Sequence, residues 1–328
     1  MEFAELSNEQ RRQLVDAQQV YAAWRPASAE LERMGSLIWQ TSRGKRYLTE
    51  QHGKVRKSLG RETPELKAKK EAHDARRKAL TTKAKALKKR LYQMAPVNRA
   101  LKLGRIPTIA ANILRELDRE GLLGTHIVVA GTNALYAYEA VTGTLLDSQH
   151  VATTDADLLW DANQSLLLAA TGVPREGFLS ILRRADKSFR ADYGLNPTND
   201  DGYIVDLLCA ESDNFQAMKV DGDVEATQMP GVQWLLSSPP LDAVAVAEDG
   251  YPVRIVVPDP RAFALHKLWV SQRADRQAIK RPRDATHAAV VSELAARYLQ
   301  QPLVAKDMPW LPKDLKALVK ELKSSKVK

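Results

Sequence analysis

The sequence has a single cysteine, Cys209, among its 328 residues. One thiol excludes an internal disulfide and leaves no cysteine partner for a zinc site. No run of about 18 apolar residues is present, which excludes a transmembrane helix of ordinary length. The N-terminal stretch MEFAELSNEQRRQ also lacks the apolar core of a secretory signal. Together these absences favour a cytoplasmic protein.

Aromatic residues are also few, at 6% of the chain, and the six tryptophans are scattered and do not alternate with basic residues. That scatter favours tryptophans that pack in a core over tryptophans that stack nucleic-acid bases. Hydrophobic residues make up 44% and charged residues 27%, which is ordinary for a folded, soluble protein. The length allows two or three domains around a substantial core.

Positive charge is concentrated in the first third of the chain. Residues 1–105 contain 25 Lys and Arg against 11 Asp and Glu, whereas the remaining residues contain 24 against 29. The densest stretch is 54–90, with 15 basic and 4 acidic residues. Such a field suggests a polyanionic partner such as RNA or tRNA. A solvated, lysine-rich helix without a partner explains the charge equally well.

The N-terminal third is predicted to be mostly helical. Ser7 and Gln10 have the spacing of a capping box, which predicts a helix beginning next to Ser7. We expect Pro26 to end this helix and a second, short helix to cover residues 28–34.

A small β-meander is expected near residues 36–60, where short runs with strand composition are separated by glycines. A long basic helix that lies along another element is then expected over residues 64–94, with Pro96 ending it. Residues 1–105 are therefore predicted to form a basic, mostly helical module that contains this meander.

From residue 106 the pattern becomes that of an α/β (α+β) fold, a mixed sheet with helices. We expect this catalytic core to cover residues 106–258 and a C-terminal helical region to cover 259–328. Asp249-Gly250 between two apolar runs predicts a β-hairpin within the core. The strands of the sheet are expected at residues 127–130, 156–160 and 203–208.

Three aspartates in these strands are the candidates for chemistry. Alternate residues of a strand share a face, so Asp155 and Asp157 project together while Ala156 and Leu158 face the core. Two like charges so close repel each other unless a cation lies between them, and Mg²⁺ suits oxygen ligands. Asp206 is an isolated acid in an apolar strand. If the strands are neighbours, the three carboxylates could hold two metal ions about 4 Å apart.

The turn Gly131-Thr132-Asn133 between a strand and a helix adds to this pattern. Glycine lets the backbone approach a phosphate closely, and the helix that follows presents free N–H groups. Thr132 contributes a hydroxyl. By itself a Gly-Thr turn is usually an ordinary connection, and an Asp-x-Asp pair is common in surface loops. The combination with Asp206 is the specific signal.

With these residues, the chain resembles the nucleotidyltransferase superfamily related to DNA polymerase β. That superfamily has a Gly-Ser or Gly-Gly turn, then Asp-x-Asp, then a third acid in a neighbouring strand. More narrowly, the chain resembles the bacterial GSU2403-type nucleotidyltransferase-fold proteins, a likeness that implies a fold and not an established reaction. The supporting stretches are residues 46–48, 57–60, 129–139, 154–160 and 264–269.

The chain departs from the superfamily pattern in two respects. Thr132 stands where Ser or Gly is usual, which keeps a hydroxyl if Ser is the reference. The span from Gly131 to Asp155 is also longer than usual, so we expect the extra residues, around 142–153, to form a loop. The longer span weakens the transfer of a role to the turn more than to the acids.

The resemblance implies metal-dependent chemistry on an NTP such as ATP. Asp155, Asp157 and Asp206 would be the catalytic residues and would bind Mg²⁺ or Mn²⁺. The implied nucleotide-binding residues are Gly131, Thr132, Asn133, Lys267 and Ser271. Lys267 matches the lysine that a helix after the core offers to the triphosphate, although a solvated helix lysine is an equal alternative. His266 is more typical of a packing residue than of a catalyst. The basic run 276–283 either extends the same positive wall or forms a basic loop.

The leading hypothesis is therefore an enzyme that transfers a nucleoside monophosphate from NTP to an acceptor hydroxyl. The basic stretch 54–90 favours RNA or tRNA as the acceptor, and a protein side chain is the other candidate. Two further classes remain open. One is a degenerate nucleotidyltransferase-fold regulator or toxin–antitoxin partner, and the other is an RNA-binding protein without activity.

Overall fold

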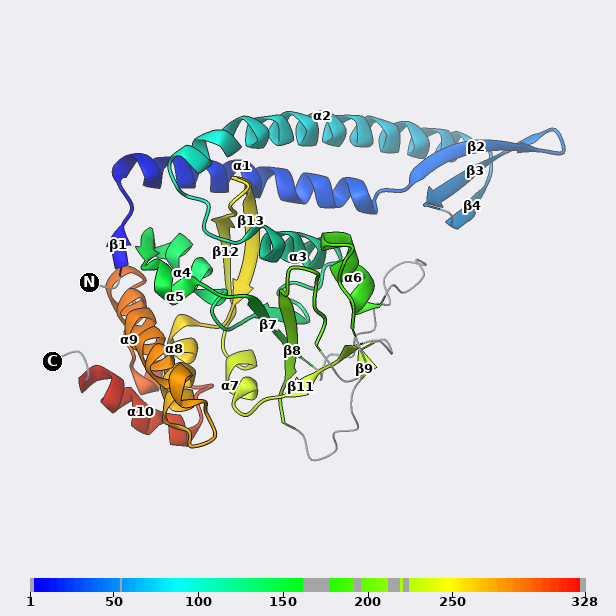
Figure 1. Cartoon of the computed structure of the whole chain (residues 1–328). Coiled ribbons are helices and arrows are strands. Elements are labelled where there is room, and N and C mark those ends of the chain that lie inside the picture. The colour runs from blue at the N-terminus through cyan, green and yellow to red at the C-terminus, as the bar shows by residue number, and fades with distance from the viewer. Residues whose placement is uncertain are drawn as a thin grey trace.

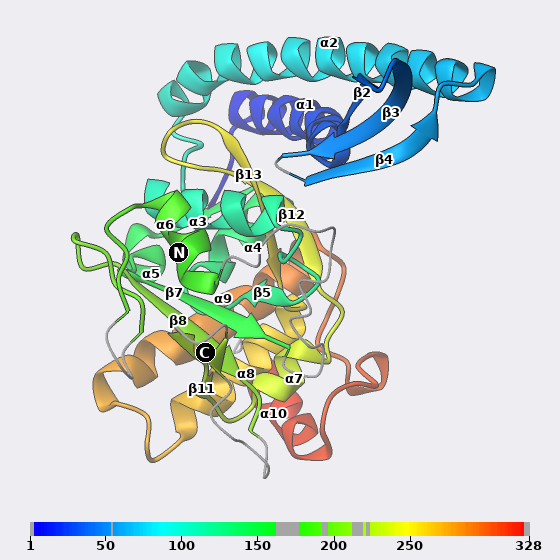
Figure 2. The same ribbon diagram turned by 90° about the vertical axis from the view of Figure 1, so that its right-hand side faces the viewer.

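In the computed structural model of the protein, two long helices lie side by side across one edge of an α/β body (Figures 1 and 2). The C-terminal helices pack against another side of that body (Figure 1). The structure describes residues 3–53, 55–161, 177–191, 196–211, 219–220 and 224–324. None of the helices in these ranges is long and apolar enough to cross a membrane.

The first long helix, α1 (Asn8–Arg33), begins as the sequence predicts. The Ser7 hydroxyl accepts from the Gln10 backbone N–H, and the Gln10 side chain accepts from the Ser7 N–H, which completes the capping box. The predicted break at Pro26 is wrong, because α1 continues through Pro26 to Arg33. Packing offsets the lost hydrogen bond: Ala27 is buried, and Glu30 pairs with Arg76 of the second helix.

The predicted β-meander is confirmed. Strands β2 (Ser36–Ser42), β3 (Lys45–His52) and β4 (Val55–Arg61) form an antiparallel sheet in chain order. This sheet lies at the far end of the helical pair, away from the α/β body (Figure 1). It therefore connects α1 to the second long helix.

The second long helix, α2 (Pro64–Ala100), returns along α1. The prediction that Pro96 ends it is also wrong, because the helix runs four residues further. Its last turn is held by tertiary contacts. Asn98 is fully buried, donates to the Gly250 carbonyl at 2.8 Å and accepts from the Gln13 side chain at 2.7 Å. A satisfied buried amide at this position favours helix beyond the proline.

The helical pair is also joined to the body by charge. Asp118 accepts from Arg25 at 2.6 Å and from Arg254 at 2.8 Å. Burial raises the pKa of Asp118, but these two hydrogen bonds outweigh burial and lower it below its usual value. In addition, strand β1 (Phe3–Glu5) pairs with β6 (Thr144–Leu146) of the body. The boundaries at residues 105 and 258 stay predictions.

The body is built on a four-stranded sheet in the order β11-β8-β7-β5. Because β5 runs antiparallel to β7 while β7, β8 and β11 are parallel, the sheet is mixed, as predicted. A separate hairpin turns at Asp249-Gly250, also as predicted. The sheet strands are β5 (Ile127–Val129), β7 (Asp155–Trp160), β8 (Ile204–Cys209) and β11 (Thr227–Gln228), and the hairpin strands are β12 (Leu241–Val246) and β13 (Pro252–Val257).

Helices cover both faces of this sheet. The helices of the body are α3 (Thr108–Arg119), α4 (Ala134–Thr142), α5 (Ser148–Val151), α6 (Phe178–Ala185) and α7 (Val232–Leu236). The C-terminal region has α8 (Pro260–Gln272), α9 (Arg281–Tyr298) and α10 (Lys313–Ser324), with short 3₁₀ turns at Ala278–Lys280 and Ala305–Asp307. A short two-stranded sheet joins β9 (Lys219–Val220) and β10 (Val224–Glu225).

The predicted loop around residues 142–153 is largely wrong. The structure has β6 and α5 within this stretch. Pairing of β6 with β1, far away in sequence, supplies the hydrogen bonds that make it a strand, and a local pattern cannot reveal such a partner.

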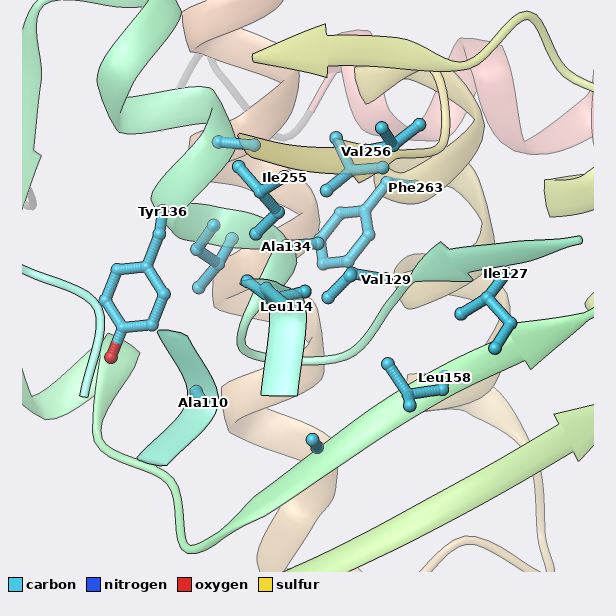
Figure 3. Close-up of a cluster of buried hydrophobic side chains, with 14 of the residues drawn as sticks. Ala110, Leu114, Ile127, Val129, Ala134, Tyr136, Leu158, Ile255, Val256 and Phe263 are labelled. Atoms are coloured by element: carbon cyan, nitrogen blue, oxygen red, sulfur yellow. The ribbon is translucent and has the colours of Figure 1, made fainter. Parts of the chain in front are cut away.

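The main hydrophobic core lies on one face of the mixed sheet. Ala156 and Leu158 of β7 point into it, as the alternation predicts. Figure 3 shows Leu158 with side chains from α3, β5, α4, β13 and α8, and Phe263 lies among Val129, Ala134 and Val256. The opposite face carries a smaller cluster that includes Leu159, Leu208 and Leu235. Apolar side chains therefore cover both faces of the sheet. A polar side chain on either face needs a hydrogen-bond or ionic partner close by.

We predict that Gly250→Ala destabilises the protein by roughly 2–4 kcal/mol. Gly250 has φ +85°, and an added Cβ would lie 2.2 Å from the carbonyl oxygen of Ala95 in α2. Gly44→Ala is the matched control, because Gly44 also has a positive φ (+71°) but no heavy atom within 4 Å of the added Cβ. Urea unfolding of both variants measures the difference. Equal losses of stability would contradict the close approach of α2 to the hairpin.

Candidate active site

The sheet brings two of the three predicted aspartates side by side. Asp157 of β7 and Asp206 of β8 are partners in the parallel register. Adjacent strands lie about 4.8 Å apart, so these two backbones are as close as a sheet permits. Asp155 lies two residues before Asp157 on the same face of β7. The prediction that Asp157 and Asp206 lie on adjacent strands and point to one face is confirmed.

The turn at Gly131 packs directly against Asp157. Gly131 has φ +57°, and a Cβ there would lie 1.7 Å from Oδ2 of Asp157. The neighbouring Ala130 N–H donates to the Asp157 carbonyl at 2.9 Å. Only glycine allows both this backbone conformation and this contact. The Gly-Thr turn and the Asp-x-Asp strand therefore form one unit despite their separation in sequence.

The carboxylates have different surroundings. Asp155 accepts from the Thr153 hydroxyl, and Asp206 accepts from the Asn196 side chain. Among the described residues, none donates a hydrogen bond to the Asp157 side chain. No three His, Cys, Asp or Glu side chains within the described ranges are grouped as ligands of one metal ion. The hydrogen bonds from Thr153 and Asn196 use only Oδ1 of Asp155 and Asp206, so the second oxygen of each carboxylate can still coordinate a cation.

Electrostatics at Asp157 disfavour its ionised form. The pKa of Asp157 is raised to about 6, and burial is the largest cause. The charge of Lys267 opposes the shift, those of Asp155 and Asp206 add to it, and that of Arg276 opposes it. Burial, followed by the charge of Asp155, also raises the pKa of Asp206. Repulsion of this kind is relieved by a bound cation or by a proton.

A buried cluster of charges stands opposite these acids. Asp284 of α9, only 3% exposed, accepts from Lys267 at 2.9 Å and from Arg276 at 2.7 Å. Burial would raise the pKa of Asp284, but the charge of Lys267 and the hydrogen bond from Arg276 lower it. Lys267 is therefore neither free nor a solvated helix lysine. Asp284 fixes both cations on the side that faces Asp157.

The other predicted nucleotide-binding residues, Thr132, Asn133 and Ser271, each have a different hydrogen-bond partner. The Thr132 hydroxyl accepts from Arg283 at 2.8 Å, and Arg283 also donates to the Ala152 carbonyl. Asn133 is buried and donates to the Asp155 carbonyl at 2.7 Å. The Ser271 hydroxyl donates to the Leu268 carbonyl within its own helix. Thus Thr132 faces a guanidinium, whereas Asn133 orients the backbone of Asp155.

A cleft of about 850 Å³, including its open mouth, lies beside Asp157. Gly131, Asp157, Lys267 and Arg276 line it, whereas Ser271 is not among its described lining residues. From the sequence, Arg283 is predicted only as part of the basic run 276–283, in a positive wall or a basic loop, and Asp284 has no predicted role. The available signal was an acid directly after a basic run, and only the fold reveals which charges meet.

Comparison with known families agrees with this geometry. The family model described as "Nucleotidyltransferase" matches residues 108–309, more than half of the chain. The chain belongs to the nucleotidyltransferase family. No curated protein and no solved structure matches it. The narrower likeness to the GSU2403-type group stays a prediction. The matched range contains the sheet, the three aspartates and the α8–α9 pair.

The donor set suits the divalent ion that such transferases generally use. Asp155, Asp157 and Asp206 supply only oxygen ligands, and they lie on one face of two paired strands. The half-buried Asp157 carboxylate lacks a hydrogen-bond donor from the described residues, so a cation is a suitable partner for it.

We predict that Asp157→Asn stabilises the metal-free protein at pH 7. The native pKa of about 6 lies above the ordinary value of 3.8 for an aspartate, so ionisation of Asp157 costs the native state roughly 3 kcal/mol once both states are ionised. The wild type should therefore lose stability relative to Asp157→Asn as pH rises from about 4 to 6, with a constant difference above that range.

Urea unfolding in EDTA between pH 4.5 and 7.5 tests this. Asp201→Asn is the control, because Asp201 is an exposed acid near the start of β8. A stability advantage of Asp157→Asn that does not grow with pH would show that Asp157 is not a destabilised carboxylate.

Proposed function

We propose that the protein transfers a nucleoside monophosphate from an NTP to an acceptor hydroxyl, which loses its proton, and releases pyrophosphate, in a reaction that depends on Mg²⁺ or Mn²⁺. The observation that carries this proposal is the register of Asp157 with Asp206, with Asp155 on the same face, beside a cleft that also holds Lys267 and Arg276. Asp155, Asp157 and Asp206 would hold the metal, which would balance the triphosphate charge and activate the acceptor hydroxyl.

The protein's own groups have separate roles in this proposal. Lys267 and Arg276, fixed by Asp284, attract the triphosphate to the cleft. The Gly131 turn lets phosphate oxygens approach the N–H groups at the start of α4. Arg283, held against Thr132, adds a guanidinium at the same turn. Ser271, bonded within its helix, has no place in the phosphate site, and Asn133 acts by positioning Asp155.

We predict that Asp155→Asn and Asp157→Asn abolish transfer while the fold is kept. Asn preserves size but removes the charge that attracts a cation. Mg²⁺ with NTP should raise the melting temperature of the wild type, because a ligand of the native state stabilises it, and these two variants should lose most of that rise. Asp206→Asn should keep much of the rise but lose transfer, because the acceptor hydroxyl is not activated.

The measurement combines purified protein, each labelled NTP, Mg²⁺ or Mn²⁺, and total RNA or lysate, and follows transferred label. Asp201→Asn is the control and should behave as the wild type. If all three site variants kept both the thermal shift and the transfer of label, the site assignment would be wrong. A thermal shift without transfer to any acceptor would instead favour the degenerate regulator.

The surface of α2 supports RNA as the acceptor. This helix has 37 residues and is therefore about 55 Å long. Lys70, Arg76 and Lys67 pair with acids, but other basic side chains of α2 have no partner among the described residues. These are Lys69, Lys78, Lys83, Lys85, Lys88, Lys89 and Arg90. Exposed, unpaired cations spread over such a length suit a phosphate backbone.

We predict that changing Lys83, Lys85, Lys88 and Lys89 to Gln weakens RNA binding and flattens its salt dependence. Each lost phosphate contact should lower the slope of log K against log salt by roughly 0.7–0.9. The control changes four exposed lysines elsewhere, Lys187, Lys306, Lys313 and Lys316, to Gln. Fluorescence anisotropy with total tRNA at several salt concentrations measures the slopes. Equal effects of both sets, or binding that ignores salt, would contradict a role for α2.

A further inference from the structure

The meander formed by β2, β3 and β4 carries charge of nearly one sign. Residues 36–61 contain 7 Lys and Arg, and Glu50 is their one acid. The sheet lies at the far end of the helical pair, away from the α/β body and its carboxylates (Figure 1). Neither the candidate active site nor the basic surface of α2 includes these residues, so the proposed function gives their charge no role.

One face of this sheet is packed and the other is open. Leu37 and Leu48 lie on the packed face and are 6% and 0% exposed. Gly60 pairs with Leu48, and a Cβ on Gly60 would lie 3.6 Å from the side chain of Leu66 in α2. This face is therefore directed to α2. Ile38 lies on the other face, because it alternates with Leu37, and it is 41% exposed.

The register of the strands defines which side chains share the open face. Tyr47 is the partner of Gln40 in β2 and of Arg61 in β4. A hydrogen bond of 3.2 Å from the Thr49 hydroxyl to Gln40 joins two of these side chains across the strands. The side chains of the open face are those of Ile38, Gln40, Lys45, Tyr47, Thr49, Gln51, Arg56, Ser58 and Arg61.

No acid lies among the side chains of the open face. Glu50 is the register partner of Lys57 and belongs to the packed face with it. Lys45 and Arg61 are exposed and have no ion-pair partner among the described residues. Arg56 is exposed too, and its Nε donates to the neutral Gln51 side chain at 3.2 Å. The open face therefore presents uncompensated positive charge, which is complementary to a polyanion.

An aromatic ring lies between these cations. Tyr47 of the central strand is half-buried. Its direct partner Arg61 has its Cβ about 5 Å away, and Ile38 is its diagonal neighbour on β2, at about 7–8 Å. A ring flanked by an aliphatic side chain and guanidinium groups is the combination on which unpaired bases stack while their phosphates meet positive charge.

The shape of the open face favours single-stranded RNA over a duplex. In a duplex the bases stack on one another, so a flat surface meets mainly phosphates and sugars and its ring gains no base to stack on. Three strands about 4.8 Å apart form a surface that is wide enough for about two bases. Helix α2 leads from this surface to the body (Figure 1), so one RNA can contact both.

We propose that the open face of the meander binds an unpaired segment of RNA, with a base stacked on Tyr47 and the adjoining phosphates on Arg56 and Arg61. This inference rests on the proposed function for one point, that the bound RNA is the acceptor. Helix α2 is about 55 Å long and separates the open face from the body. The acceptor is then an RNA whose unpaired bases lie far from the reacting hydroxyl.

The first test separates bases from phosphates. Fluorescence anisotropy compares a labelled oligouridylate, which does not pair with itself, with an abasic oligonucleotide of the same length. The wild type should bind the oligouridylate about tenfold more tightly, because only its bases can stack. Tyr47→Thr, which keeps a residue suited to a strand, should bind both equally, and Tyr47→Phe should keep the preference. Equal binding of both by the wild type, or a preference that survives in Tyr47→Thr, would overturn the proposal.

The design also excludes a purely structural role of Tyr47. Such a role would weaken binding of the oligouridylate and of the abasic oligonucleotide to the same extent. An RNA duplex of the same length serves as a further control. Its binding through the phosphates should be the same in Tyr47→Thr and in the wild type.

The second test uses two neighbouring cations of β4 that lie on opposite faces. Arg56→Gln should lower the slope of log K against log salt for the oligouridylate by about 0.7, because one phosphate contact is lost. Lys57→Gln, on the packed face, should leave the slope close to that of the wild type. Equal effects of the two changes would contradict binding at the open face.

An acidic protein segment is the alternative occupant of a basic sheet face. Polyglutamate is therefore tested as a second labelled probe. Binding of polyglutamate that depends on Arg56, together with RNA binding that does not, would assign the face to an acidic protein and overturn the proposal.

The proposed function and this inference fail in different ways. Base-dependent binding that requires Tyr47, without transfer of label to any RNA, would leave the open face as an RNA site and remove the enzymatic function. Transfer of label to RNA at the wild-type rate by Tyr47→Thr, at RNA concentrations below saturation, would leave the function and remove the open face from acceptor binding. Because the anisotropy measurement needs neither NTP nor metal ion, its result does not depend on activity.

Discussion

The parallel pairing of β7 with β8 is the constraint on which the rest of the site depends. It fixes Asp157 beside Asp206 and leaves Asp155 on the same face, so three like charges share one small area. The sheet cannot relieve this by a small shift, because slipping the register by one residue would turn apolar side chains such as Leu158 out of the core. The repulsion is therefore a fixed property of the fold, and the surroundings must compensate for it.

The repulsion between the aspartates is compensated by charged side chains of α8, α9 and the segment between them, which follow the sheet in sequence. Lys267 and Arg276 lower the pKa of Asp157 against the effect of burial, and Asp284 holds both of them. Since Asp284 is itself buried, removing it would leave two cations without their partner. The α8–α9 pair is therefore part of the site as much as the sheet is. The family match to residues 108–309 includes both.

Local patterns predicted the parts of this structure that depend on local physics. The capping box at Ser7, the meander, the Asp249-Gly250 hairpin and the face shared by Asp155 and Asp157 follow from spacing and turn chemistry. The errors came where distant contacts overrule a local preference. Helices α1 and α2 continue through their prolines because each is held on both sides of the proline by packing and hydrogen bonds.

In the candidate site, too, the sequence predicts the features that depend on local residues and misses those that depend on distant contacts. Three acids in two apolar strands and a Gly-Thr turn could be recognised in the sequence, because burying a carboxylate or adopting a positive φ restricts the residues allowed. The sequence could not reveal that Lys267 pairs with Asp284 or that Thr132 pairs with Arg283. Each pairing joins residues whose separation in the chain gives no periodic signal, and surface and buried lysines look alike in sequence.

The junction between the helical pair and the body has a consequence for any large acceptor. Asn98 and Asp118 tie α2 and α1 to the β12–β13 hairpin through buried or half-buried hydrogen bonds. That hairpin packs in turn on α4, the helix that follows the Gly131 turn. A chain of packed, hydrogen-bonded elements therefore connects the basic surface of α2 to the carboxylates. A polyanion bound along α2 would therefore have a defined orientation relative to Asp157, and under the proposed function the helix would select which part of an acceptor reaches the site.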